Sequence, residues 1–272
     1  MTWGFASYET RFRWAAALWA VLMTIWCMSP LPWRVRVFGA ILWVAITLGV
    51  SVRFAWWRSR SAREVPIFLR MRCANEVVVE RLIRNLVAAG YRLQTVSEAL
   101  EAPARKAVAI TFDDGGREAF SRIFPLLKKL HAKATFFVTD RGAREADFLK
   151  PLEIQEMARS GLVEFGGTAA PLPPGAEVEA WRAEILRNRR WLTGVLGALP
   201  RAFAYPDGTL PEVLGPEVQA VGYPHAFTVN ASLRAPAEDP LAIPRRDIPG
   251  TYKPWQAYLM ATRGRFSLCS RA

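Results

Sequence analysis

Two adjacent carboxylates stand directly after an apolar run. Asp113 and Asp114 follow residues 107–112 and precede Gly115. Carboxylates can take up a proton during catalysis or bind a divalent cation. Both also have structural alternatives: Asp113 could accept hydrogen bonds from loop amides, and Asp114 could cap a helix that opens near Arg117. The sequence leaves the chemical and the structural roles open.

Side chains that usually complete a metal site are rare in this chain. It has only two histidines, His131 and His225. Each comes just before an expected strand, so both are predicted at the amino ends of parallel strands, opposite to the functional end. The cysteines, Cys27, Cys73 and Cys269, show no metal-binding spacing. Their pattern argues against a cysteine-based zinc site and against a disulfide framework.

From residue 65 onward, short apolar runs alternate with segments of helical periodicity. The expected strands are residues 65–69, 107–112, 134–138, 162–165, 202–205 and 226–229. The expected helices are residues 79–87, 117–130, 152–160, 177–195 and 210–221. This order predicts an α/β domain with a parallel sheet or barrel, and a functional site at the carboxyl ends of its strands.

A series of motifs in this domain resembles the polysaccharide deacetylases, the NodB-homology group of carbohydrate esterase family 4. One of these motifs is Ala109-Ile110-Thr111-Phe112-Asp113-Asp114-Gly115, at the end of an expected strand, and the specificity lies in the whole series rather than in any one motif. The others follow in the family's order at residues 65–67, 90–91, 133–138, 161–166, 203–208, 222–223 and 243–245. The resemblance covers about residues 65 to 265 and implies a distorted (β/α) barrel of NodB-homology type.

The resemblance implies that a metal-bound water, usually on zinc, removes N-acetyl groups from a carbohydrate. In such enzymes the first Asp of the motif is the general base, and the second Asp and two histidines hold the metal. Asp113 and Asp114 match the two carboxylate positions, but Thr168 and Leu172 stand where the histidines belong. No histidine follows His225 to act as a late general acid. We therefore expect no bound cofactor and no metal-dependent deacetylation.

Other positions also depart from the family pattern. Arg70-Met71 replaces the family's Tyr-His after the first strand, and Asp207 stands where the family often has Tyr. Asp207 is expected in a turn. Arg245 is expected either to face an acidic partner such as Asp113 or to form part of a solvated pair with Arg246. The predicted substrate-binding residues are Asp114, Tyr205, Asp207 and Arg245, with Asp113 at the base position.

Two apolar runs precede the domain. Residues 14–33 carry no charge, residues 37–57 are mostly apolar, and a short break with two prolines separates them. Each run is about as long as a helix that crosses the hydrocarbon of a bilayer. We predict a transmembrane hairpin within an anchor of residues 1–63, followed by a deacetylase-like domain of residues 64–272. The alternative is a cleaved signal peptide and a core helix, but the first run is long for a signal and no small-residue cleavage site precedes the second.

The charge distribution suggests how the anchor is oriented. The formal net charge is +12, with arginines clustered before the first run and after the second, whereas only Arg34 and Arg36 lie between them. Basic residues favour the cytoplasmic side, so both termini and the domain are predicted on the cytoplasmic side of a bacterial-type inner membrane. The sequence has no zinc finger, helix-turn-helix or RNA-binding signature, so the membrane rather than nucleic acid is the expected partner.

Three functions remain open at this stage. The first is a degenerate deacetylase, a pseudoenzyme that binds an N-acetylated glycan or a polysaccharide-synthesis complex at the membrane. The second is an active hydrolase of carbon–nitrogen bonds that uses Asp113 without metal or holds a metal by unforeseen ligands. The third is a structural membrane partner of a glycosyltransferase complex. The missing histidines favour the first and third, while the retained pair Asp113–Asp114 favours the first and second. The sequence therefore favours the first.

Overall fold

The computed structural model describes residues 66–71, 75–173, 175–208, 214–229 and 239–263, together with Pro32. Apart from Pro32, both predicted membrane spans lie outside these residues. Among the described residues, no helix is long and apolar enough to cross a membrane. The chain divides into two units, Met1–Ala62 and Arg63–Ala272, and the description below concerns the second.

The strands form a closed parallel barrel. The strands are β1 (Ile67–Met71), β2 (Arg92–Leu93), β3 (Ala107–Phe112), β4 (Ala134–Val138), β5 (Val163–Thr168), β6 (Ala202–Ala204), β7 (His225–Val229) and β8 (Ile243–Ile248). All their pairings are parallel, and β1 pairs with both β3 and β8. Seven strands, β1 and β3 to β8, thus close on themselves, while β2 pairs only with the start of β3. The predicted α/β class is confirmed, and the sheet is a barrel.

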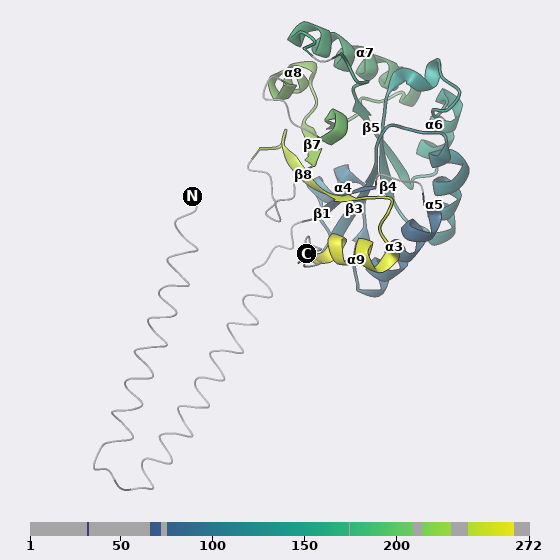
Figure 1. The fold of residues 1–272 in the computed structure, drawn as a ribbon, viewed down its shortest axis with the longest axis vertical. Helices are drawn as coiled ribbons and strands as arrows, with labels where there is room; N and C mark the ends of the chain where they lie inside the picture. The colour runs from purple at the N-terminus through teal and green to yellow at the C-terminus, as the bar shows by residue number, and fades with distance from the viewer. Residues whose placement is uncertain are drawn as a thin grey trace, which may run out of the picture. The chain divides into compact units, whose positions relative to one another are not determined.

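Helices surround the barrel, as Figure 1 shows. They are α3 (Glu76–Ala88), α4 (Val96–Glu101), α5 (Phe124–Leu130), α6 (Pro151–Arg159), α7 (Val178–Leu196), α8 (Leu214–Val221) and α9 (Pro254–Arg263). Helix α3 packs beside α9, and α7 packs beside both α6 and α8. Because successive side chains of a strand point to opposite faces, the strands contribute side chains to two cores. One core lies between the strands and these helices, and the other lies inside the barrel.

The inner core contains Phe68, Ala109, Phe137, Phe227 and Ile243 from five different strands. Helix α4 contributes to the same cluster and covers the amino ends of the strands. Its first N–H groups donate to the Oγ1 atom of Thr135 on β4 and the carboxylate of Glu164 on β5, at 3.0 and 3.1 Å. Glu164 therefore holds α4 in place. Helix α4 therefore lies against the amino ends of β4 and β5, opposite to the end that carries Asp113.

Several predicted boundaries differ from the structure. Strand β5 continues to Thr168, beyond the predicted end at residue 165. The predicted helix 117–130 begins as a π-helical turn, η1 (Ala119–Ile123), before α5. The sequence analysis did not predict α4, α9, β2 or β8. Strand β8 matters most, because it carries Arg245.

Candidate functional site

Asp113 lies just past the carboxyl end of β3, between two arginines. The guanidinium of Arg245 contacts it with both terminal nitrogens, Nη1 at 2.6 Å from Oδ1 and Nη2 at 3.0 Å from Oδ2. The Nε atom of Arg70 lies 2.7 Å from Oδ2, at an angle outside hydrogen-bond geometry. The Asp113 side chain is only 8% exposed. It therefore forms a buried ion cluster, and the alternative that it binds loop amides is replaced by these two guanidinium contacts.

Arg245 is fully buried, at 0% exposure, and reaches Asp113 from β8. Its Nη1 atom also donates to the hydroxyl of Thr111 at 2.9 Å, and that hydroxyl donates to the carbonyl oxygen of Leu69 at 2.8 Å. Its guanidinium carbon lies 5.2 Å from the ring centroid of Phe137. Of the two alternatives for Arg245, the structure shows the one in which it faces Asp113. Burial of this extent leaves the side chain to position Asp113 rather than to contact a ligand.

Arg70 is the part of this cluster that the sequence analysis did not predict. It lies near the end of β1, is 5% exposed, and donates from Nη1 to the carbonyl oxygen of Asp207 at 3.0 Å. Asp207 has φ 56° in the turn Pro206–Gly208, so the predicted turn is confirmed. The hydroxyl of Thr228 on β7 donates to the carbonyl of Gly208 at 2.6 Å and fixes the other end of this turn. The sequence feature that could have identified Arg70 is the presence of an arginine in a strand whose other residues are apolar.

Asp114 differs from Asp113 in almost every respect. It is exposed and has φ 71°, in the left-handed region. Desolvation of its carboxyl and the charge of Asp113 raise the pKa of Asp114, against a smaller lowering by Arg70. The expected helix cap is wrong: the N–H groups of Arg117 and Ala119 bond to backbone carbonyls instead. Asp114 is therefore the carboxylate of the pair that a ligand can reach.

The two positions where the family carries histidines are occupied differently here. Thr168 is the last residue of β5, is buried, and donates from its hydroxyl to the carbonyl oxygen of Ala204 at 2.8 Å. Leu172 lies in the following loop and is partly exposed. The amide N–H of Ala170 in that loop donates to Glu184 of α7 at 3.2 Å. A threonine hydroxyl that serves a backbone carbonyl and a leucine side chain supply no metal ligand.

Neither histidine lies near the carboxylate pair. His131 follows α5 in a left-handed conformation, ahead of β4, and His225 is the first residue of β7. Both are at the amino ends of strands, as predicted. Desolvation and the charge of Arg201 lower the pKa of His225. The structure thus separates the chain's two imidazoles from Asp113 and Asp114.

Tyr205 follows β6 and is 1% exposed. Its hydroxyl donates to the carbonyl oxygen of Leu241 at 2.9 Å, and burial raises its pKa to about 12. The phenol packs against Phe203 at a centroid distance of 5.6 Å. This environment gives Tyr205 a structural contact and leaves little of it to contact a substrate.

The residues at the carboxyl ends do not fit the metal that the family resemblance implies. Asp113 has both oxygens engaged by guanidinium groups, and Asp114 stands without imidazole neighbours at positions 168 and 172. Among the described residues, no group of three or more His, Cys, Asp or Glu side chains could hold a metal ion. One free carboxylate is a poor site for zinc, which prefers nitrogen and sulfur ligands in tetrahedral sites.

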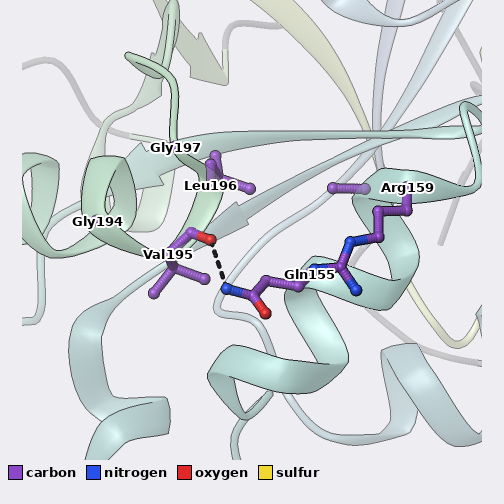
Figure 2. Close-up of a pocket in the computed structure, with 7 residues that line it drawn as sticks. Gln155, Arg159, Gly194, Val195, Leu196 and Gly197 are labelled. Carbon is purple, nitrogen blue, oxygen red and sulfur yellow. Dashed lines mark hydrogen bonds between the residues drawn. The ribbon is translucent and has the colours of Figure 1, made fainter.

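A pocket of about 260 Å³ lies away from this cluster, where α6 meets the end of α7 (Figure 2). Gln155 and Arg159 line it from α6, and residues 194–197 line it from α7 and its C-terminal cap. The Nε2 atom of Gln155 donates to the carbonyl of Val195 at 2.9 Å. None of the predicted site residues lines this pocket, so it is separate from the candidate site.

One family model matches part of this barrel domain. Residues 101–226 match the family model described as Polysaccharide deacetylase. The matched segment runs from β3 to the start of β7 and covers just under half of the chain, so it relates this part of the barrel to that family. The carboxylate pair Asp113–Asp114 lies within the matched segment.

The individual relatives are distant. The chain is 24% identical over 156 residues to the Staphylococcus aureus poly-beta-1,6-N-acetyl-D-glucosamine N-deacetylase, covering 52% of this chain and 54% of that enzyme. It is 24% identical over 190 residues to the Bacillus subtilis protein YxkH, covering 65% of this chain and 68% of that protein. The chain thus spans about half the length of the Staphylococcus aureus enzyme.

Solved structures show the same fold at similar distance. The Streptococcus pyogenes deacetylase PplD, in complex with acetate, has a TM-score of 0.63 at 23% identity, covering 72% of this chain and 96% of that one. IcaB from Ammonifex degensii has a TM-score of 0.61 at 23% identity, covering 74% and 97%. At this identity the likeness concerns the fold, and the site must be judged from its own residues.

Proposed function

We propose that this chain is a membrane-anchored, polysaccharide deacetylase-like protein that binds N-acetylated glycan and lacks metal-dependent deacetylase activity. The observation that carries the proposal is that both carboxylate oxygens of Asp113 already contact guanidinium groups. A general base must accept a proton from the attacking water, but both oxygens of Asp113 are engaged by Arg70 and Arg245. Thr168 and Leu172 offer no imidazole that could complete a metal site or act on a leaving group.

Glycan binding would use the polar residue that is still exposed at the carboxyl ends of the barrel strands. Asp114 is exposed there, and a carboxylate accepts hydrogen bonds from sugar hydroxyl or acetamido N–H groups. The Staphylococcus aureus relative is named for poly-beta-1,6-N-acetyl-D-glucosamine, which makes oligomers of this sugar the natural probe. The protein would take part in exopolysaccharide or cell-surface polysaccharide metabolism, alone or within a polysaccharide-synthesis complex.

Binding and catalysis can be tested on the same preparation. We expect the full chain, purified in detergent, to bind β-1,6-linked N-acetylglucosamine oligomers in isothermal titration calorimetry. The Asp114→Ala variant should bind about ten-fold more weakly, because a hydrogen bond to a charged group contributes roughly 1.5–3 kcal/mol. Glu156→Ala is the control, since it removes an exposed carboxylate from the outer helix α6. The wild-type chain should release no acetate above background and bind no stoichiometric zinc.

Two results would contradict this proposal. One zinc per chain, lost on Asp114→Ala and accompanied by acetate release, would establish an active hydrolase. Equal binding by wild type and Asp114→Ala, or no binding by either, would remove the role of the carboxylate and favour a structural partner of a glycosyltransferase.

The membrane location is a separate part of the proposal and depends on residues 14–33 and 37–57. We expect both termini on the cytoplasmic side, because arginines cluster outside the two runs. Reporter fusions after Ala272 and in the turn near Arg34 measure this directly. The turn fusion should be active only in a periplasmic reporter and the Ala272 fusion only in a cytoplasmic one. A periplasmic reporter that is active at Ala272 would show that only one run spans.

A further inference from the structure

Asp113, the first carboxylate of the pair at the end of β3, has two positive charges packed against it. Arg245 contributes one through its two-nitrogen contact with Asp113, at 2.6 and 3.0 Å. Arg70 contributes the other through the 2.7 Å approach of its Nε atom to Oδ2. Both arginines are buried, at 0% and 5% exposure. Two guanidinium groups therefore contact Asp113, and their two positive charges equal the charge that a divalent ion would bring to this end of β3.

The position of Arg70 is held independently of Asp113. Its Nη1 atom donates to the carbonyl oxygen of Asp207 at 3.0 Å. A Cβ added to Gly208 would lie 3.1 Å from the same Nη1 atom, so a side chain at position 208 would crowd the guanidinium. Strand β1 and the turn after β6 therefore position the Arg70 side chain together.

We propose that Arg70, together with Arg245, replaces the charge of a divalent metal at Asp113 and Asp114, and that Arg70 thereby excludes metal from the site. The inference deepens the proposed function, since it rests on a site without metal and explains how that site tolerates two carboxylates. It assigns Arg70 a role distinct from that of Arg245, because Arg70 reaches Asp113 from β1 and also donates to the Asp207 carbonyl.

Electrostatics indicates the size of the effect. The charge of Arg70 lowers the pKa of the Asp114 carboxyl, although desolvation and the charge of Asp113 raise it by more. A divalent ion bound at Asp113 would lie within several ångström of the Arg70 guanidinium, whose Nε atom is 2.7 Å from Oδ2. Repulsion between charges of +2 and +1 at that range changes affinity by about ten-fold even when screened as in water, and by more in a partly buried site.

The test compares neutral and charged substitutions of Arg70 in the full chain, purified in detergent. Arg70→Met keeps the side-chain volume and removes the charge, and Arg70→Gln removes the charge but keeps a donor for the Asp207 carbonyl. Arg70→Lys keeps the charge and is the matched control. With zinc chloride as the probe, calorimetry should show that both neutral variants bind zinc at least ten-fold more tightly than wild type or Arg70→Lys. Adding Asp114→Asn to Arg70→Met should abolish this gain.

The outcomes separate this inference from the proposed function. Stoichiometric zinc on the wild-type chain would overturn the proposed function. A wild type without zinc and neutral variants that gain none would overturn only the role of Arg70. Zinc binding by Arg70→Lys equal to that of Arg70→Met would also overturn it, because charge would then not matter. If the neutral variants unfold, recovery of their thermal transition with zinc supports the inference, and failure to recover while Arg70→Lys stays folded contradicts it.

Discussion

Replacing Asp113 with asparagine is expected to destabilise the fold by about 3–5 kcal/mol, the usual cost of removing one partner from a buried ion pair. Arg245 at 0% exposure and Arg70 at 5% would each lose their anionic partner in a place where water cannot substitute for it. For a domain of this size the melting temperature should fall on the order of 10 °C. Thermal unfolding of the full chain, followed by near-ultraviolet circular dichroism, measures the shift.

The matched control is Asp114→Asn, one residue further along the chain. Asp114 is exposed and lies in the left-handed region at φ 71°, which asparagine tolerates well. Its replacement should change stability by no more than about 0.5 kcal/mol. Similar small shifts for both variants would show that Asp113 does not anchor the barrel.

The contrast also determines how ligand binding should be studied. A double replacement of Asp113 and Asp114 would lose binding simply because the barrel end comes apart. Asp114 can be changed alone, so it is the position at which a role in binding can be separated from a role in folding.

The outline of the barrel could be predicted because its strands carry their signal locally. Strands β3 and β4 are buried at every position, so each appears as an apolar run interrupted only by one threonine. Strand β8 has no such signal, since it contains a proline and three charged residues within Ile243–Ile248. It becomes a strand because β1 and β7 pair with it on either side and because Arg245 forms an ion pair with Asp113.

The end of β5 could not be predicted for a related reason. Gly166 and Gly167 have low strand propensity, yet the strand passes through both. A Cβ on Gly166 would lie 2.6 Å from ring atoms of Phe137 and 2.7 Å from the carbonyl oxygen of Ala202. These glycines are therefore needed for neighbouring strands to pack, and that requirement is visible only in three dimensions. The same holds for Arg70, whose partner is set by the pairing of β1 with β3.

Replacing Gly208 with alanine is the second change with a large expected effect, about 2–5 kcal/mol of destabilisation. Gly208 has φ +74°, where an L-residue costs roughly 1–2 kcal/mol. The added Cβ would also overlap the Cγ2 atom of Val229 and approach Nη1 of Arg70. Overpacking of this kind typically costs a further 1–3 kcal/mol or so.

Gly197→Ala provides the matched control for the backbone part of this cost. Gly197 ends α7 with φ +70°, and nothing lies within 4 Å of the Cβ it would carry. Its replacement should therefore cost only about 1–2 kcal/mol. A second control adds Val229→Ala to Gly208→Ala, which removes the overlapping methyl group.

Thermal unfolding of wild type, Gly208→Ala, Val229→Ala and the double variant gives a double-mutant cycle between positions 208 and 229, with Gly197→Ala measured beside it. If the overlap contributes as expected, the double variant should be more stable than the sum of the single changes predicts. An additive result, with Gly208→Ala no worse than Gly197→Ala, would mean that the turn moves aside without cost. The Asp207 carbonyl in this turn accepts a hydrogen bond from Arg70. A turn that moves without a cost in stability could not hold the Arg70 guanidinium against Asp113.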